Sequence, residues 1–491
     1  MPSPDSPAIL VARFLQSNNY NETLSTLLAE AGLPLDAGVV QPGDITLEQV
    51  LEEKKIFDLS VNFEKVGVGD EDNGWTNPAP KTPSVINSGP STANILHVSI
   101  EGLSKSTDQD PYSRVLLWTT ADRRLNLAST ERPYALVKTL NDGHDSPILS
   151  CAVIAERWLL STSMSGQLVL SDLRSEKIVE QVQNHTKYVV KVAFCCEEGE
   201  DEETGSILVA TAGWDQKVFL YRSKMVPEES GPVRRLGKPI ASLSVPDNPE
   251  SILIMKHPES GKPLIIMSTR DSTFLHYYGL PKESEETPST SNSGAASSEA
   301  LPSLVRLGRQ NLAPHSNSWI AFSPSAFALS PSDPTLLAVA TSSVPHMKLL
   351  LVRLLIPPPP LTSPTTATTG ADPPATQAAQ TREALRIADK EAAAILSYTN
   401  TLAPQTPYST PQVCWRPDSS GVWVNGDDGV VRGIEARSGK VTQTLRDGHV
   451  PGSKIRCICA GVDASGREVV LSGGFDKRLV IWSVSEDASV S

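Results

Sequence analysis

The sequence predicts an all-β protein built from repeated small antiparallel sheets and preceded by a short α-helical unit. From about residue 93 the chain consists of short runs rich in Val, Ile, Leu and Thr, separated by Gly, Asp, Asn and Ser. Pairs of such runs recur along the chain, as in VVLSGGFDKRLVIWSV near its C-terminus. A length of 491 residues is too great for one ordinary core, but it suits a ring of repeated units.

Composition and charge argue against several classes of function. The formal net charge is −13, and a general nucleic-acid or anionic-membrane surface would need clustered Lys and Arg. None of the six cysteines has a metal-type spacing, so we expect thiols in a reducing compartment. The start, MPSPDSPAIL, has neither a basic nor an apolar segment of the signal-peptide type. We therefore expect a cytoplasmic or nuclear protein, or one found in both places.

Residues 6–38 predict two short helices. Ser6 and Pro7 suit the start of the first helix, and the sequence SNNY interrupts it. Asn19 and Glu22 have the spacing of a capping box for the second helix, which Gly32 ends. A further short helix is expected within residues 44–56.

An internal repeat organises the β-rich part of the chain. Its pattern is a His, an apolar strand with a small polar residue, an Asp four positions later, and an aromatic residue six positions after the Asp. The two most complete copies are His449, Ser472, Asp476, Trp482 and His185, Thr211, Asp215, Tyr221. Other copies are partial; one of them has Ser165 where Asp is expected.

This repeat resembles that of the WD-repeat β-propeller family, over residues 93–485. The resemblance implies four-stranded blades, and the hairpins along the chain count to seven of them. We expect disordered insertions at 282–300 and 357–381. It also implies a structural tetrad in which the Asp accepts a hydrogen bond from the His, the His bonds the Ser or Thr, and that hydroxyl bonds the aromatic residue. A buried carboxylate is tolerable only with such partners, so these His and Asp residues are interpreted as structural rather than catalytic.

The helical pair resembles the lissencephaly-type homology (LisH) motif. The matching residues are Phe14, Leu15, Tyr20, Thr23, Leu27 and Glu30. Asn19 stands where the family usually has glycine. The resemblance implies homodimerisation, for which the expected residues are Leu10, Phe14, Leu24, Leu27 and Leu28. A unit of fewer than about 40 residues usually needs a partner, a metal or a disulfide to be stable. The alternative is that the pair docks on its own propeller.

The seventh blade lacks an outer strand after its last hairpin. Residues 57–65 alternate as Leu-Ser-Val-Asn-Phe and are predicted to supply that strand, followed by a flexible linker at 66–92. The alternative is that Ile56 to Phe63 continues the preceding helix.

Neither a Gly-rich phosphate loop, HExxH nor GxSxG occurs in the sequence, so we expect no enzyme, cofactor or metal, and a small-molecule ligand is not favoured. The expected function is a scaffold that binds proteins or peptides on one compact propeller face. The residues expected on that face are Arg123, Trp214, Arg270, Asp427 and Phe475. Alternatively, Trp214 and Phe475 only pack on neighbouring loops.

A second hypothesis is a substrate receptor of a cullin-type ubiquitin ligase. The stretches SDLR (171–174) and IEAR (434–437) resemble the Trp-Asp-x-Arg box of such receptors, although neither contains the Trp.

Overall fold

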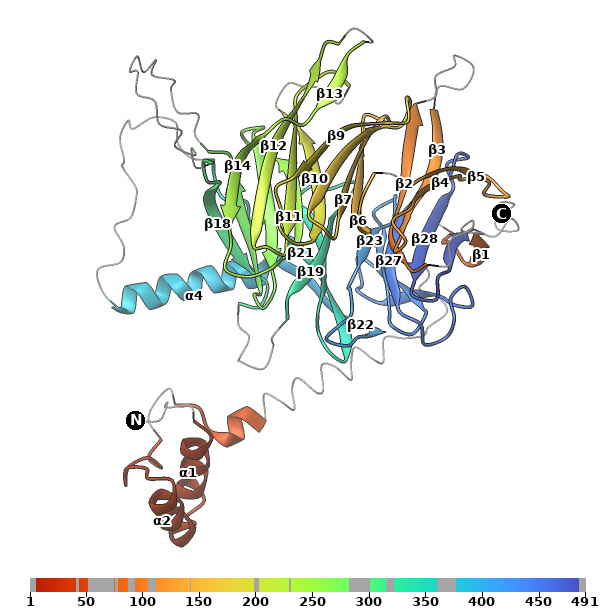
Figure 1. Ribbon diagram of the computed structural model, residues 1–491. Helices are drawn as coiled ribbons and strands as arrows, with labels where there is room; N and C mark the ends of the chain where they lie inside the picture. The colour runs from red at the N-terminus through yellow and green to blue at the C-terminus, as the bar shows by residue number, and fades with distance from the viewer. Residues whose placement is uncertain are drawn as a thin grey trace, which may run out of the picture. The chain divides into compact units, whose positions relative to one another are not determined.

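The computed structural model describes residues 6–40, 44–51, 75, 78–86, 93–104, 112–141, 143–197, 203–228, 231–281, 301–314, 322–359 and 377–484. The chain divides into two compact units, Met1–Asp70 and Glu71–Ser491. The first unit is helical and the second consists mainly of β-sheets (Figure 1).

The helical unit is a pair of helices, α1 (Pro7–Ser17) and α2 (Asn21–Glu30). Ser6 is the N-cap of α1 and Pro7 occupies its first turn, where a missing N–H costs nothing. The two helices share a small apolar core, formed by Ala12, Leu15, Leu24, Leu28 and Leu33.

The connection between the helices differs from the predicted capping box. The N-cap of α2 is Tyr20, and no side-chain bond caps that end, so the capping role assigned to Asn19 and Glu22 is wrong. Asn19 instead adopts φ 62°, a left-handed conformation. Glycine adopts this conformation without strain and Asn tolerates it better than most residues, which explains why Asn19 can replace the family's glycine.

The segment after the pair is anchored to α1. Residues 47–51 are helical. The Thr46 hydroxyl accepts from the backbone N–H of Gln49 at 3.3 Å, and the Gln49 side chain accepts from the backbone N–H of Thr46 at 3.0 Å, which makes a capping box. Buried Arg13 donates to the Ile45 carbonyl at 2.9 Å and pairs with Asp44 at 2.9 Å. The rest of the helix predicted at 44–56 lies outside the described residues.

The second unit is a seven-bladed β-propeller with one antiparallel sheet in each blade. Blades one and two are β2 (Ile95–Ser104), β3 (Tyr112–Thr120), β4 (Leu125–Ser129), β5 (Leu136–Leu140), and β6 (Ile148–Ile154), β7 (Trp158–Ser163), β8 (Gln167–Asp172), β9 (Lys177–Gln183). Blade three is β10 (Val189–Cys196), β11 (Ile207–Gly213), β12 (Lys217–Val226) and β14 (Pro239–Ser244), with β13 (Val233–Arg235) pairing the far end of β12.

The remaining blades follow the same order. Blade four is β15 (Pro249–Lys256), β16 (Pro263–Thr269), β17 (Phe274–Gly279), β18 (Val305–Asn311), and blade five is β19 (Pro324–Leu329), β20 (Leu336–Thr341), β21 (His346–Arg353), β22 (Ile395–Pro404). Blade six is β23 (Val413–Trp415), β24 (Gly421–Val424), β25 (Val431–Glu435), β26 (Val441–Leu445). Blade seven combines β27 (Ile455–Val462), β28 (Glu468–Gly474) and β29 (Leu479–Ser483) with β1 (Thr82–Ile86).

Apolar side chains fill every interface between neighbouring blades. One cluster joins each pair of blades around the ring, because alternate residues of each strand face opposite neighbours. The pair formed by blades seven and one has a cluster of the same kind, which includes Ile95, Trp118, Leu471 and Ile481. The ring is therefore closed by a packed interface as well as by strand pairing.

The strand that closes the ring is β1, not the predicted segment 57–65. β1 pairs antiparallel with β29, from Thr82 opposite Ser483 to Ile86 opposite Leu479. The assignment of 57–65 to this place is wrong, and those residues themselves lie outside the described ones. Part of the predicted 66–92 linker is consequently ordered as an outer strand. Pro83 is tolerated there because an outer strand has one side that needs no ladder hydrogen bonds.

The two predicted insertions have different outcomes. Residues 282–300 lie outside the described residues. Within the second, predicted to be disordered at 357–381, α4 (Gln377–Ala393) begins, and this helix leads directly into β22 (Figure 1). The C-terminal end of α4 is attached to blade four, where buried Glu391 accepts a bond from the backbone N–H of Asn311 at 2.8 Å.

Candidate functional sites

The tetrad of blade seven is a continuous hydrogen-bonded chain. The indole N–H of Trp482 donates to Ser472 Oγ at 2.9 Å, and Ser472 lies 2.9 Å from His449 Nε2. His449 Nδ1 lies 3.0 Å from Asp476, which also accepts from the backbone N–H of Val450. Burial by itself raises the pKa of Asp476, but the bonds from His449 and from backbone N–H groups hold it below its ordinary value.

Blade three contains the same arrangement. His185 lies 2.9 Å from Asp215 and 2.8 Å from Thr211. Tyr221 takes the place of the Trp, and its hydroxyl accepts from Asn184 at 3.0 Å. In both tetrads the two ring nitrogens of the His are engaged by neighbours in the same blade, so neither faces a substrate. The hydrogen bonds of the tetrads hold the turns of their blades in place, which is a structural role.

Blade two shows what happens without the Asp. His144 Nε2 lies 2.8 Å from Ser161, but Ser165, at the Asp position, bonds Asp145 at 2.6 Å instead. His144 Nδ1 is consequently buried without a partner. Burial lowers the pKa of His144 to about 4, so this imidazole is neutral at pH 7.

The residues predicted to bind a partner lie in turns of one class. Arg123, Trp214, Arg270, Asp427 and Phe475 each lie between the second and third strands of a blade. Because the strands of every blade run antiparallel from the inside outward, these turns share one face of the ring with the loops that enter the next blade. We call this face, with its turns and loops, the turn face.

Trp214 has a structural role in addition to its place on the turn face. Its ring lies 5.0 Å from that of Tyr188, and the Arg270 guanidinium lies 4.7 Å from its centroid. Arg270 also pairs with Glu250 at 2.6 Å. Trp214 therefore links blades three and four and is only partly exposed, which agrees with the alternative that it packs on neighbouring loops.

Asp427 is likewise tied to its neighbours. It pairs with Lys454 at 2.8 Å and accepts from Ser409 at 2.6 Å. Lys454 in turn donates to Thr406 at 2.7 Å. Phe475 differs from these residues, because 40% of its side chain is exposed.

Sequence reasoning missed further apolar side chains on the turn face. Exposed large apolar residues in its turns and loops also include Met164, Val344, Tyr408 and Val450. Tyr408 is the most exposed at 89%. Met164 occupies the position before the expected Asp, as Trp214 and Phe475 do, but this copy has Ser165 in place of the Asp, and the candidate residues were taken from positions before an Asp. Tyr408 and Val450 lie in loops between blades, which the motif does not mark.

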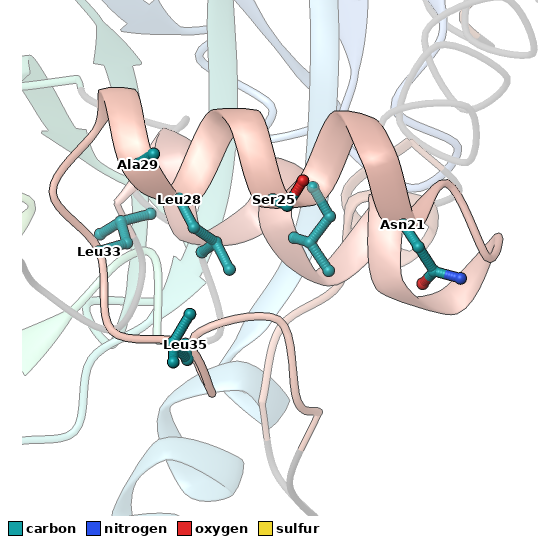
Figure 2. Close-up of a pocket in the computed structure, with 7 residues that line it drawn as sticks. Asn21, Ser25, Leu28, Ala29, Leu33 and Leu35 are labelled. Carbon is teal, nitrogen blue, oxygen red and sulfur yellow. The ribbon is translucent and has the colours of Figure 1, made fainter.

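The helical unit offers a second surface. A shallow groove runs along α2 and is lined by Asn21, Leu24, Ser25, Leu28, Ala29, Leu33 and Leu35. Figure 2 shows Leu28, Leu33 and Leu35 gathered at one end of it and Asn21 toward the other. Leu35 is 91% exposed, an unusual state for a leucine.

The predicted dimerisation residues divide into two groups. Leu24 and Leu28 are buried in the core between the two helices of a single copy. Leu10, Phe14 and Leu27 are only partly buried. An apolar stripe in the sequence cannot separate these two situations, since both give the same periodicity.

A family model covers most of the chain. The model of the UCP007778 beta-propeller domain matches residues 91–483. The model of the UCP007778 LisH domain matches residues 8–38. The chain belongs to the UCP007778 family. The resemblances to LisH motifs and to β-propellers are thereby confirmed. None of the curated proteins compared with the chain matches it.

LisH and propeller domains generally mediate protein interactions, and a UCP007778 propeller is of a type that is usually non-catalytic. Among the described residues, no group of three His, Cys, Asp or Glu side chains could hold a metal ion. None of the six cysteines, all of which are among the described residues, forms a disulfide. The helices in the described part of the chain are each too short or too polar to cross a membrane.

Proposed function

We propose that this protein is a non-enzymatic scaffold that homodimerises through its LisH unit and binds a partner protein on the turn face. The observation that carries the proposal is the group of exposed apolar side chains there: Met164, Val344, Tyr408, Val450 and Phe475. Aromatic side chains at the centre of an interface contribute disproportionately to affinity. A dimer would present two such faces, and two linked sites raise avidity through effective concentration.

The test compares protein capture by matched variants. The triple variant Tyr408→Ala, Val450→Ala, Phe475→Ala removes apolar area from the turn face. The control, Val137→Ala with Ile178→Ala, removes exposed apolar side chains from the outer strands β5 and β9. Quantitative mass spectrometry of affinity-purified complexes should show partners that are lost with the triple variant and kept with the control, while melting temperatures stay alike. Equal capture by all three proteins would contradict the proposal.

The ubiquitin-ligase hypothesis has one observation in its favour. Arg174 and Arg437 are both exposed, and both follow the third strand of a blade, which puts them on the face opposite the turn face. An adaptor could bind there without competing with a partner on the turn face. Co-purification of the cullin adaptor that is abolished by Arg174→Ala with Arg437→Ala would support this function, and unchanged or absent binding would reject it.

A further inference from the structure

The outer half of blade four carries a ladder of aromatic and basic side chains. Alternate residues of β17 place Phe274, His276 and Tyr278 on one face of the sheet. In the neighbouring strand β18, Arg309 lies opposite His276 and Arg306 lies opposite Tyr278. Residues that are paired in this way project from the same face, so the two arginines lie beside the aromatic row.

The ladder is held by ring contacts. The rings of Phe274 and His276 have centroids 6.3 Å apart, and those of His276 and Tyr278 are 6.4 Å apart. The Arg309 guanidinium lies 4.4 Å from the Phe274 centroid. This cation–π contact fixes the guanidinium without neutralising its charge.

The charges of the ladder lack counterions within the described residues. Arg306 and Arg309 are exposed and pair with no carboxylate there. Two other exposed arginines do have acidic partners, in the pairs Arg353–Asp333 and Arg386–Glu383.

The pKa of His276 is sensitive to the positive charges of the two arginines. Burial, and then the charges of Arg306 and Arg309, lower the pKa of His276 to about 4. Its Nδ1 is buried and has no hydrogen-bond partner. Two like charges at neighbouring ladder positions repel each other, and an anion of two negative charges would relieve that repulsion.

We propose that Arg306 and Arg309 bind a phosphate monoester on an extended peptide segment of a partner protein. Among the described strands β18 pairs only with β17, so the middle of its far edge, between the bridge at Ser303 and the Asn311 N–H that bonds Glu391, can pair with an added strand. A phosphorylated residue of that strand would lie about 5 Å across from the arginines, within reach of bidentate guanidinium bonds. The site is distinct from the turn face and does not depend on binding there.

The number of cations in the ladder favours a single phosphate monoester over a nucleic acid. A polynucleotide gains affinity by neutralising many successive phosphates along a basic track. The ladder offers two arginines in one blade, which suits one phosphate group. Guanidinium is also the side chain best matched to phosphate geometry.

The experiment uses the full chain, immobilised, and a degenerate library of nine-residue peptides with a central phosphoserine. The same library treated with phosphatase is the matched probe, and a twelve-residue oligothymidylate is the nucleic-acid probe. The wild type should retain the phosphorylated library at least tenfold better than the dephosphorylated one. Arg306→Ala with Arg309→Ala should remove that preference, and Arg306→Lys with Arg309→Lys should keep only part of it.

Arg446→Ala is the control, since Arg446 is an exposed arginine at the end of β26 in blade six. This variant should bind as the wild type does, and all variants should melt at similar temperatures because the substituted side chains are exposed. Retention without a phosphate preference would overturn the proposal. Tighter binding of the oligothymidylate, lost on substitution of both arginines, would overturn it in favour of a nucleic-acid site.

Discussion

Trp75 packs edge-on against Trp423, with ring centroids 5.0 Å apart and planes 70° apart. The Arg416 guanidinium covers Trp75 at 4.3 Å from its centroid and also pairs with Glu468 at 2.6 Å. Trp75 precedes β1 in the chain, while Trp423 belongs to blade six. The chain is therefore fixed to blade six by a side chain before it is fixed to blade seven by a strand.

Truncation should locate the ring-closing segment. Removal of residues 1–70 should leave the propeller's melting temperature nearly unchanged, because Trp75 and β1 remain. Removal of residues 1–88 should lower it by several degrees or cause aggregation, since β29 would become an unpaired edge. Differential scanning fluorimetry and gel filtration measure both effects. Similar melting temperatures for the two truncated proteins would show that β1 does not close the ring.

The contact of Trp75 with Gly433 provides a double-mutant test. A Cβ at Gly433 would overlap the Trp75 ring, so Gly433→Ala must displace that ring. We expect a loss of about 1–3 kcal/mol in the free energy of unfolding. In a Trp75→Ala background the same change should cost less, because the overlap with Trp75 is gone and only the close contact with the Trp423 ring remains. Denaturant unfolding of the four proteins measures the coupling, and additive losses would contradict the contact.

Dimerisation should depend on exposed residues of the helical unit. Leu35→Asp should convert the proposed dimer to a monomer in light scattering without changing the propeller's melting temperature, since Leu35 is 91% exposed. Phe14→Asp with Leu27→Asp should do the same. Val11→Asp is a control at an exposed apolar residue outside the groove lining. A wild-type monomer at micromolar concentration would reject dimerisation altogether.

His144 should make blade two sensitive to acid. Its pKa is lowered from an ordinary value near 6.5 to about 4, so the folded state resists protonation. Stability from this group is fully present above about pH 6.5 and is lost as the pH falls toward 4. His144→Gln keeps a donor near Ser161 but does not titrate. The stability difference between wild type and variant should therefore shrink between pH 7 and 4.5, and a constant difference in thermal melts would argue against a buried neutral imidazole.

The seven blades could be predicted because the repeat is local. The two complete copies fix a turn through Asp476 and Asp215, whose His partners lie 27 and 30 residues away in the sequence. Ring closure could not be predicted in this way. β1 contains Pro83, and Pro78 and Pro80 precede it, so the segment does not have the sequence pattern of a strand. The alternation of apolar and polar residues in 57–65 is more regular than that in 82–86, which led to the wrong assignment of the closing strand.

The candidate surfaces were predictable only in part. Motif positions led to Phe475, but the same reasoning gave Trp214 and Asp427, which are largely engaged by neighbours. Tyr408 lies in an unmarked loop, and only the fold brings it to the turn face. The Arg306 and Arg309 ladder arises from strand register, which depends on a bulge between Tyr277 and Tyr278 that no sequence pattern signals.

The pairing of β1 with β29 also sets the order in which the molecule can mature on the ribosome. β1 is synthesised near the start and its partner near the other end, so the strand waits for its neighbour through nearly the whole propeller. At about 5–20 residues per second, that interval is roughly 20–80 s. During it, blades one to six can form in succession, while β1 and the face of blade one that packs on blade seven stay uncovered. Release of the C-terminal hairpin then completes both contacts in one event, so nascent chains stalled before β29 should be the form that chaperones hold.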